Sequence, residues 1–508
     1  MTHEDRSATE ETGGGSLKLT TFRGGLMLGG ATIGMRVFSV ITSIILARLL
    51  LPAEFGQVDL AMVVLSIVAI FSALGLPSAV IQTSGDKDKS AFSAFVVTFS
   101  MGCLVFLICV VAAPWLGFFL GDPHVVPILQ WLSVTVLLAG ATRIPEALIQ
   151  KELQFGRMSI IGILTEVSTA AVSITLAWMG WGVWSLVYGM IVGAALNAVL
   201  VWAFCPSVSW LRPSLWDRGI VTQMLGFGAK MVGSTSVYTF YSYIDNYVVG
   251  RMLGTEALGY YGRAFNLTSK TVDSVNRTIG VVLFPSYAQV QQDKVRLSRA
   301  YLKSLRMISS ITIPVALGLY AVADELIPTL LGKAWIPAIP ALKVLSLMSL
   351  LKPLSSTTSA LFISTGHPGF NLRAGLAVTA TLIPGMLLLL SWGIVGVAWA
   401  VVIAHAVGLV YNVYQVQSIV PGTVRAMGEA VLPALGGSVI MAFAIMGVRS
   451  MILATHFSSS ALVALGCLVG TGVLVYGATI ALTQRPLLRE ILDMVRARRS
   501  RIGTEGRV

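Results

Sequence analysis

Long apolar stretches, separated by short polar segments, follow one another along almost the whole chain. A helix that crosses the hydrocarbon core of a bilayer needs about 20 consecutive, mainly apolar residues, and about 14 segments satisfy this requirement. The pattern predicts an all-α polytopic membrane protein whose short loops leave no room for a soluble catalytic domain. The predicted spans cover residues 27–50, 56–82, 91–113, 125–145, 158–178, 181–204, 224–249, 264–288, 305–323, 338–364, 371–391, 394–417, 430–448 and 461–482.

An internal repeat organises these spans. The segment LARLLLPAEFGQVDLA at 46–61 aligns with VGRMLGTEALGYYGRA at 249–264, at an offset of 203 residues. Each copy follows the first helix of a block of six spans, and an even number of spans gives both blocks the same polarity. We therefore expect two six-helix lobes in a parallel repeat, related by an axis along the membrane normal. The predicted divisions are a disordered cytoplasmic tail (1–22), an N-lobe with spans 1–6 (23–205), a C-lobe with spans 7–12 (206–420), spans 13 and 14 (421–484) and a basic amphipathic cytoplasmic tail (485–508).

Glycine and proline residues inside the spans predict where helices approach each other or bend. The spacing of Gly189 and Gly193 permits close packing of two helices. Gly75, Leu76 and Pro77 follow one another in the second span, and Pro314 lies in the ninth. Because proline lacks a backbone N–H, we expect kinks at these places.

The composition supports a membrane protein and excludes most soluble classes. The chain is 55% hydrophobic and 11% charged, whereas soluble domains carry roughly 25% charged residues. Its net charge of +12 would indicate nucleic-acid binding in a soluble protein. In a membrane protein, basic residues instead mark sidedness and contact with anionic lipids, so we expect membrane lipids and no nucleic acid as partners.

The basic residues are distributed unevenly between the two sides. Of the 35 Lys and Arg residues, 23 lie in the predicted N-tail, the even-numbered loops and the C-tail, and 5 lie in the odd-numbered loops. Cytoplasmic loops carry the excess of positive charge. The distribution predicts a multi-pass protein with both termini in the cytoplasm.

Four basic residues lie well inside the predicted spans, where each would cost about 2.5 to 3.5 kcal/mol if it faced lipid. We therefore expect them to face a polar cavity: Arg36, Lys270, Arg277 and Lys352. Arg36 and Arg277 both lie near mid-depth, where two guanidinium groups could hold a diphosphate bidentately. Lys230 lies near a span end, where we expect it to snorkel, and it could also draw an anionic headgroup inward.

Each acid or tyrosine inside the spans could have either a functional role in a cavity or a purely structural role. Asp273 and Arg277 are four residues apart on a helix, so they form either part of a cavity or a neutralised buried pair. Asp245 could pair with Lys270, and Glu166 is either a proton or cation site or a carboxyl group satisfied by a neighbouring hydroxyl. Tyr238 and Tyr241 share a helical face with Asp245 and could stack on sugar rings, or belong to the interfacial tyrosine belt.

Signatures of catalysis, of metal binding and of cofactor binding are missing from the sequence. We find no HExxH, P-loop, GxSxG or dinucleotide fingerprint, and the five histidines are scattered. We expect no catalytic residues, no metal and no cofactor, and therefore not an enzyme.

Three segments resemble a known family. The stretch FPSYAQVQQDKVRLSRAYLKSLRMISSITIPVALGLYAVADELIPTLLGKAWIPAIPALKVLSLMSLL at 284–351 is similar to the signature region of polysaccharide transporters. Residues 143–167 and 47–61 are similar to two further segments of this family, the Wzx-like flippases of the multidrug/oligosaccharidyl-lipid/polysaccharide exporter superfamily.

The resemblance implies a function that the composition does not indicate. It implies a two-lobed bundle in the bacterial inner membrane that flips a polyprenyl-diphosphate-linked oligosaccharide by alternating access, for exopolysaccharide, capsule or lipopolysaccharide O-antigen. It also implies that spans 13 and 14 guide the lipid tail, and that a polysaccharide polymerase and a chain-length regulator are partners.

Two alternatives remain open. One is a cation-coupled antiporter of drugs or other small molecules from the same superfamily, although a cavity for cations should be acidic and bases outnumber acids at mid-span here. The other is a membrane glycan polymerase or ligase, which would need a sizeable external loop with catalytic side chains.

Overall fold

The computed structural model describes residues 34–82, 86–454 and 460–483. Within these ranges only the backbone is described at 73, 227, 229–231, 233–235, 237–238, 270–282, 284–285 and 453. Both predicted terminal tails, 1–22 and 485–508, lie outside the described residues.

The described part of the chain is helical, with three short 3-10 segments and no strand. A first helix covers residues 34–49. The others are α2 (Pro52–Ala73), α3 (Leu76–Gln82), α4 (Lys87–Leu120), α5 (Val125–Lys151), α6 (Phe155–Trp178), α7 (Val183–Ala203), α8 (Arg218–Leu253), α9 (Thr255–Val290), α10 (Lys294–Leu330), α11 (Ile339–Ser364), α12 (Pro368–Leu389), α13 (Gly393–Ile419), α14 (Thr423–Ala454) and α15 (Ala461–Thr483).

Three long helices begin at an aspartate that caps their free N–H groups. Asp86 accepts hydrogen bonds from the first turn of α4, Asp217 from that of α8, and Asp293 from that of α10. The backbone hydrogen bond from Arg296 lowers the pKa of Asp293. These caps explain why α4, α8 and α10 begin 4 to 11 residues before the predicted spans do: hydropathy marks where the apolar part begins, whereas the cap marks where the helix begins.

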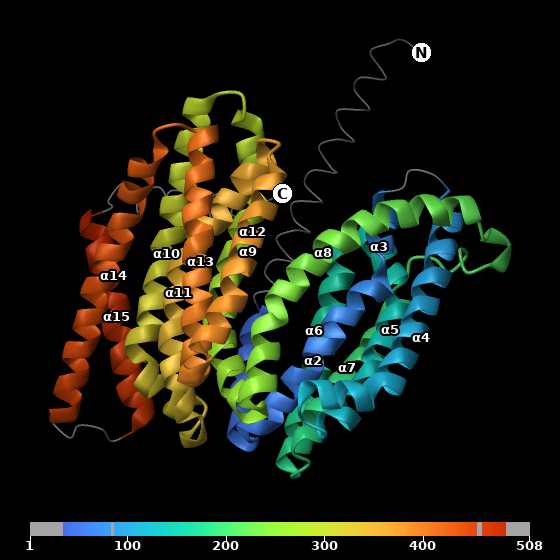
Figure 1. The fold of residues 1–508 in the computed structure, drawn as a ribbon, viewed down its shortest axis with the longest axis horizontal. Helices are drawn as coiled ribbons and strands as arrows, with labels where there is room; N and C mark the ends of the chain where they lie inside the picture. Colours follow the sequence, from blue (N-terminus) through green and yellow to red (C-terminus); the bar gives the residue numbers. More distant parts are fainter. Residues whose placement is uncertain (1–33, 83–85, 455–459, 484–508) are drawn as a thin grey trace, which may run out of the picture. The chain divides into compact units, whose positions relative to one another are not determined.

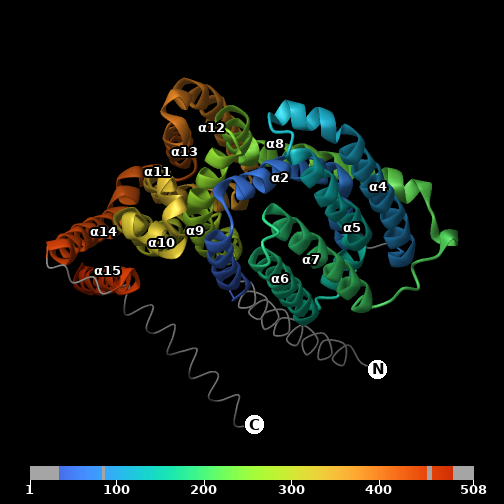
Figure 2. The same cartoon turned by 90° about the horizontal axis from the view of Figure 1, so that it is seen from below.

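The chain forms two compact units, residues up to Gly259 and residues from Tyr260. In the first unit α5 packs against α2, α4 and α7, and α6 pairs with α7 (Figures 1 and 2). α8 also packs on α2, α3 and α4 and so belongs to this unit. The first compact unit thus ends at Gly259. The sequence repeat predicts an earlier end of the N-lobe, at residue 205.

Glycines permit close helix contacts within the first unit. A Cβ atom on Gly140 of α5 would lie 3.2 Å from the Cα atom of Gly102 on α4. On α7, Cβ atoms at Gly189 and Gly193 would overlap the hydroxyl groups of Ser173 and Thr169 of α6. The close packing predicted from the spacing of Gly189 and Gly193 is confirmed.

The second predicted span is a helix with a break. Leu74 adopts a left-handed conformation with φ 47°, Gly75 follows with φ 67°, and α3 begins at the next residue. At the same place α8 approaches, because a Cβ atom on Gly228 would overlap the carbonyl oxygen of Leu74. The predicted irregularity at Gly75 is therefore confirmed as a break between α2 and α3.

In the second unit α10 packs against α11, α14 and α15, while α12 pairs with α13 (Figure 1). Tyr301 of α10 is buried, and its hydroxyl lies 3.0 Å from Oγ1 of Thr358 on α11. Pro314 interrupts the backbone ladder of α10, because it has no N–H to donate to the carbonyl group of Ser310. The hydroxyl of Tyr476 on α15 donates to this carbonyl at 2.8 Å.

Ten described helical segments are long and apolar enough to cross a membrane, and one of them contains both α12 and α13. The fold is therefore that of an all-α, multi-pass membrane protein. α8 and α9 are not among these segments, although each has 36 residues. Their polarity sets them apart from the helices around them.

Candidate functional site

The polar helices α8 and α9 carry most of the site residues expected from the sequence. The backbones of α8 and α9 are helical throughout. The helical spacing that places the expected site residues on one face of each helix is therefore present. The side chains of five expected residues lie outside the described residues: Lys230, Tyr238, Lys270, Asp273 and Arg277. The expected pairings of Asp245 with Lys270 and of Asp273 with Arg277 therefore stay predictions.

Two of the expected basic residues are half-buried, and each interacts with another group of the protein. Arg36 lies in the helix of residues 34–49, and Lys352 lies in α11 directly before Pro353. Each has a polar or electrostatic partner in the protein.

Of the two expected acids whose side chains the structure describes, Asp245 is more deeply buried than Glu166. Its residue is 5% exposed, and Oδ1 accepts a hydrogen bond of 2.8 Å from the backbone N–H of Asn246. Tyr241, one turn earlier on α8, is half-buried and also has a partner. A carboxyl group held this deep in a helix bundle needs its polar contacts, because an isolated buried charge is costly.

Glu166 lies in the middle of α6 and is half-buried. It forms no hydrogen bond or ion pair with the residues that the structure describes, and the adjacent hydroxyl of Thr165 is buried without a hydrogen-bond partner. Both interpretations from the sequence, a proton or cation site and a carboxyl group satisfied by a neighbouring hydroxyl, stay predictions.

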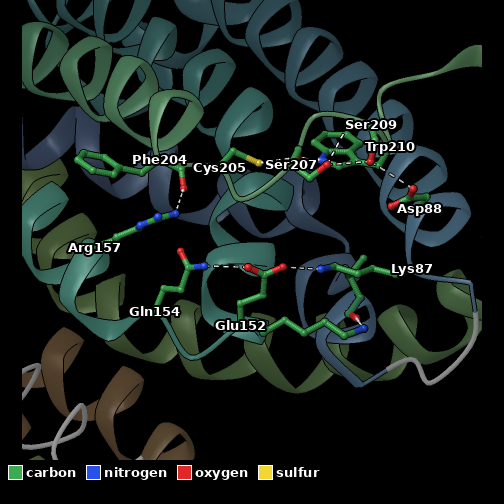
Figure 3. A network of polar contacts seen from close by, with 12 residues as sticks. Lys87, Asp88, Glu152, Gln154, Arg157, Phe204, Cys205, Ser207, Ser209 and Trp210 are labelled. Atoms are coloured by element: carbon green, nitrogen blue, oxygen red, sulfur yellow. Dashed lines mark hydrogen bonds and ion pairs between the residues drawn. The ribbon is translucent and has the colours of Figure 1, made fainter. Parts of the chain in front are cut away.

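A polar network ties together the ends of four helices in the first unit (Figure 3). Lys87 at the start of α4 forms a 2.6 Å ion pair with Glu152, which follows α5, and Gln154 donates to the same carboxylate. Arg157 of α6 donates to the carbonyl oxygen of Phe204, where α7 ends. A cation at the carboxyl end of a helix is favoured by the helix dipole.

The loop between α7 and α8 forms further hydrogen bonds at the same end of the first unit. The indole N–H of Trp210 donates to the carbonyl oxygen of Ser207 at 2.7 Å, and the hydroxyl of Ser209 lies 3.4 Å from Asp88 Oδ2 (Figure 3). Nearby in the sequence, three exposed basic side chains form no hydrogen bond or ion pair within the described part of the chain: Lys89, Arg212 and Arg218. These cations remain available to anionic groups.

A second network links three helices of the second unit and was not expected from the sequence. Lys343 Nζ of α11 lies 2.8 Å from Asp324 Oδ2 of α10. Arg449 of α14 contacts the same oxygen at 2.6 Å through Nη1, and its Nε lies 2.7 Å from Glu325 Oε1. The adjacent acids Asp324 and Glu325 were the only sign of this network in the sequence. Their partners Lys343 and Arg449 lie 19 and 125 residues away from Asp324 along the chain.

Clusters of His, Cys, Asp and Glu that could hold a metal ion do not occur among the described residues. The four cysteines are free thiols, and they range from buried to exposed. In the part of the chain that the structure describes, the polar groups brought together are ion pairs and hydrogen bonds between packed helices.

Comparisons with known proteins define the family. Residues 45–340 match the family described as Polysaccharide biosynthesis protein, which is more than half of the chain. The chain therefore belongs to this family, whose members include polysaccharide flippases of the multidrug/oligosaccharidyl-lipid/polysaccharide exporter superfamily. The family resemblance noted in the sequence is confirmed.

Two relatives align along most of their length. The Succinoglycan biosynthesis transport protein ExoT of Rhizobium meliloti is 26% identical over 487 residues, which cover 92% of this chain and 94% of the relative. The Lipopolysaccharide biosynthesis protein WzxC of Escherichia coli is 24% identical over 378 residues, covering 73% and 76%. ExoT is a transport protein by name, which agrees with the expectation that the protein is not an enzyme.

Solved structures with the same fold are transporters as well. The Lipid II flippase MurJ in an inward closed conformation superposes with a TM-score of 0.75 at 16% identity, covering 91% of this chain and all of MurJ. An inward-facing multidrug resistance transporter of the MATE family gives a TM-score of 0.60 at 17% identity, covering 76% and 95%. At these identities the similarity establishes the fold alone.

Proposed function

We propose that the protein flips a polyprenyl-diphosphate-linked oligosaccharide from the inner to the outer leaflet by alternating access. The observation that carries this proposal is the match to ExoT over 92% of the chain, since ExoT is named for succinoglycan transport. The polar helices α8 and α9 inside an otherwise apolar bundle support it, because a glycan needs a hydrated path through the membrane. The glycan belongs to an exopolysaccharide, capsule or lipopolysaccharide.

The proposed architecture has 14 transmembrane helices, counting α2 and α3 as one interrupted span. Six spans up to residue 205 form the N-lobe, six between 206 and 420 form the C-lobe, and α14 and α15 are additional. Both termini lie in the cytoplasm of a bacterium, and the protein resides in the inner membrane. The excess of basic residues in the even-numbered loops supports this orientation.

The proposed headgroup site uses Arg36 and Arg277 to bind the diphosphate bidentately. Lys270 and Lys352 add positive potential, and Lys230 attracts the headgroup from the inner leaflet. The exposed cations Lys89, Arg212 and Arg218 support such attraction on the cytoplasmic side. Tyr238 and Tyr241 stack on the sugar rings.

Coupling to an ion gradient is proposed for Glu166, which lacks a hydrogen-bond or ion-pair partner among the described residues. Asp245 and Asp273 balance the neighbouring bases. The lipid tail passes along α14 and α15, and a polysaccharide polymerase and a chain-length regulator receive the product outside.

The test is transfer of a polyprenyl-diphosphate oligosaccharide across the membrane of liposomes that contain the purified protein. Arg36→Ala and Arg277→Ala should each slow transfer about tenfold to a hundredfold, because each removes charge-assisted hydrogen bonds worth about 1.5 to 3 kcal/mol. Arg373→Ala, at an exposed arginine on α12, is the matched control and should transfer like the wild type. Glu166→Gln should abolish only the acceleration that an imposed proton or sodium gradient produces.

The outcomes separate the site from the function. Normal transfer by both arginine variants, with monodisperse protein, would refute the headgroup site. An unchanged gradient response in Glu166→Gln would refute the coupling role. No transfer by the wild type, with efflux of a cationic dye instead, would favour the drug antiporter.

A further inference from the structure

Three tryptophans surround one tyrosine at the end of the first unit where α5 and α7 begin. The ring centre of Tyr188 on α7 lies 5.9 Å from that of Trp131 on α5 and 5.9 Å from that of Trp181, in the turn between α6 and α7. Trp184, one turn before Tyr188, lies at 5.8 Å. Trp131 and Trp181 are each 48% exposed. These four residues form the aromatic cluster, which presents ring surface outside the packed interior.

A carboxylate lies beside the aromatic cluster. Glu54, in the first turn of α2, accepts a hydrogen bond of 2.7 Å from the backbone N–H of Leu51 through Oε2. Its other oxygen, Oε1, lies over Gly182, where a Cβ atom would overlap it. Gly182 has a positive φ of 54° and stands between Trp181 and Trp184 in the chain. The turn that positions two of the tryptophans therefore also approaches the carboxylate.

The polar atoms of this surface keep unused hydrogen-bonding capacity. The three indole N–H groups and the hydroxyl of Tyr188 form no hydrogen bond with the residues that the structure describes. Oε1 of Glu54 likewise accepts none from the described part of the chain. The surface thus combines aromatic faces, hydrogen-bond donors and a carboxylate acceptor.

This combination fits a saccharide. The C–H faces of a pyranose ring pack on aromatic rings, and its hydroxyl groups both donate and accept hydrogen bonds. Tryptophans of an interfacial belt need no carboxylate beside them, and Glu54 would repel anionic lipid headgroups. We propose that the aromatic cluster and Glu54 form a saccharide-binding site on the first unit, which takes the glycan as it emerges on the outer side.

The side of the membrane and the role of this site rest on the proposed orientation and function. The helices α2, α5 and α7 each begin after an odd-numbered loop, and these loops lie outside if the termini are cytoplasmic. Binding there stabilises the transferred glycan on the outer side before its release.

The test follows each tryptophan by fluorine NMR in protein that is labelled with fluorotryptophan and held in lipid nanodiscs. Single substitutions of tryptophan by phenylalanine assign the resonances. The probe is cellotetraose, a neutral oligosaccharide of β-linked glucose. Cellotetraose should shift the resonances of Trp131, Trp181 and Trp184 with one shared dissociation constant.

Trp178 is the matched control, because it ends α6 close to the same turn. It is 81% exposed and forms no ring contact with the described residues. Its resonance should not shift, and Trp178→Leu should bind cellotetraose like the wild type. Equal shifts of the Trp178 resonance and the cluster resonances would show unspecific contact and overturn the site.

Variants of the cluster separate stacking from hydrogen bonding. Trp181→Leu should weaken cellotetraose binding about fivefold to tenfold, whereas Trp181→Phe should retain most of the affinity because an aromatic face remains. Glu54→Gln keeps an oxygen for the N–H of Leu51 and loses the second carboxylate oxygen, so it should weaken binding about tenfold. Unchanged affinity in both Trp181→Leu and Glu54→Gln would overturn the site.

Lipid that carries a doxyl group distinguishes the site from an interfacial tryptophan belt. Broadening of the three cluster resonances by this lipid, with no shift by cellotetraose, would overturn the site. Binding needs no transport, so cellotetraose shifts without oligosaccharide transfer by the wild type would preserve the saccharide site and refute the proposed function. Transfer by the wild type without these shifts would preserve the function and refute the site.

Discussion

Arg449 holds two neighbouring carboxylates of α10 at once, those of Asp324 and Glu325. Lys343 also contacts Asp324, so the cluster contains two acids and two bases. Charges at the end of a membrane span are stable when they neutralise one another in this way. In the absence of Arg449, Glu325 would retain no ion pair among the described residues.

At the scale of single residues, Arg449→Ala should lower the free energy of unfolding by about 2 kcal/mol. This is less than the loss of a fully buried ion pair, because the side chains are 21% to 33% exposed. The midpoint of thermal unfolding in lipid nanodiscs measures the effect.

Arg425→Ala provides the matched control on the same helix. Arg425 pairs with Glu429, but the two side chains are 92% and 63% exposed, so the loss should be below about 0.5 kcal/mol. Equal losses in the two variants would contradict a stabilising role of the cluster.

At the scale of helices, a proline and a tyrosine explain how α15 docks onto α10. Pro314 has no N–H to donate to the carbonyl group of Ser310, and the hydroxyl of Tyr476 donates to this carbonyl from another helix. Apolar packing accompanies this bond: Ala321 and Val322 of α10 belong to the same buried hydrophobic cluster as Leu465 and Leu468 of α15.

Tyr476→Phe should therefore cost about 1 kcal/mol of stability in the wild type. In a Pro314→Ala background it should cost less, because the alanine N–H restores the helical donor for Ser310. A double-mutant cycle of unfolding midpoints measures this coupling. Strictly additive losses would show that the tyrosine does not compensate for the proline.

At the scale of the whole molecule, the distribution of Lys and Arg decides the orientation. A green fluorescent protein fused to the C-terminus should fluoresce, and alkaline phosphatase fused there should be inactive, because the positive-inside rule places this end in the cytoplasm. Alkaline phosphatase fused after Gly332, in an odd-numbered loop, should be active. The reverse pattern would contradict the proposed orientation and direction of transport.

The sequence by itself determined the all-helical membrane class, the family and the polarity of α8 and α9. These features depend on local composition or on similarity along the chain, so they need no knowledge of partners. Gly75 also disclosed the break between α2 and α3, since the effect of such a residue is local. Arg36 and Glu166 could be selected as site candidates because a charge inside an apolar span is conspicuous.

Only the tertiary structure decided which residues meet. Asp324 and Arg449 are 125 residues apart, and no periodicity links them. The repeat aligned Gly56 with Gly259, but the alignment did not reveal that a Cβ atom on Gly56 would lie 3.0 Å from the backbone nitrogen of Gly259. Contacts of this kind depend on how packed helices cross, which is a property of the folded chain and not of either segment alone.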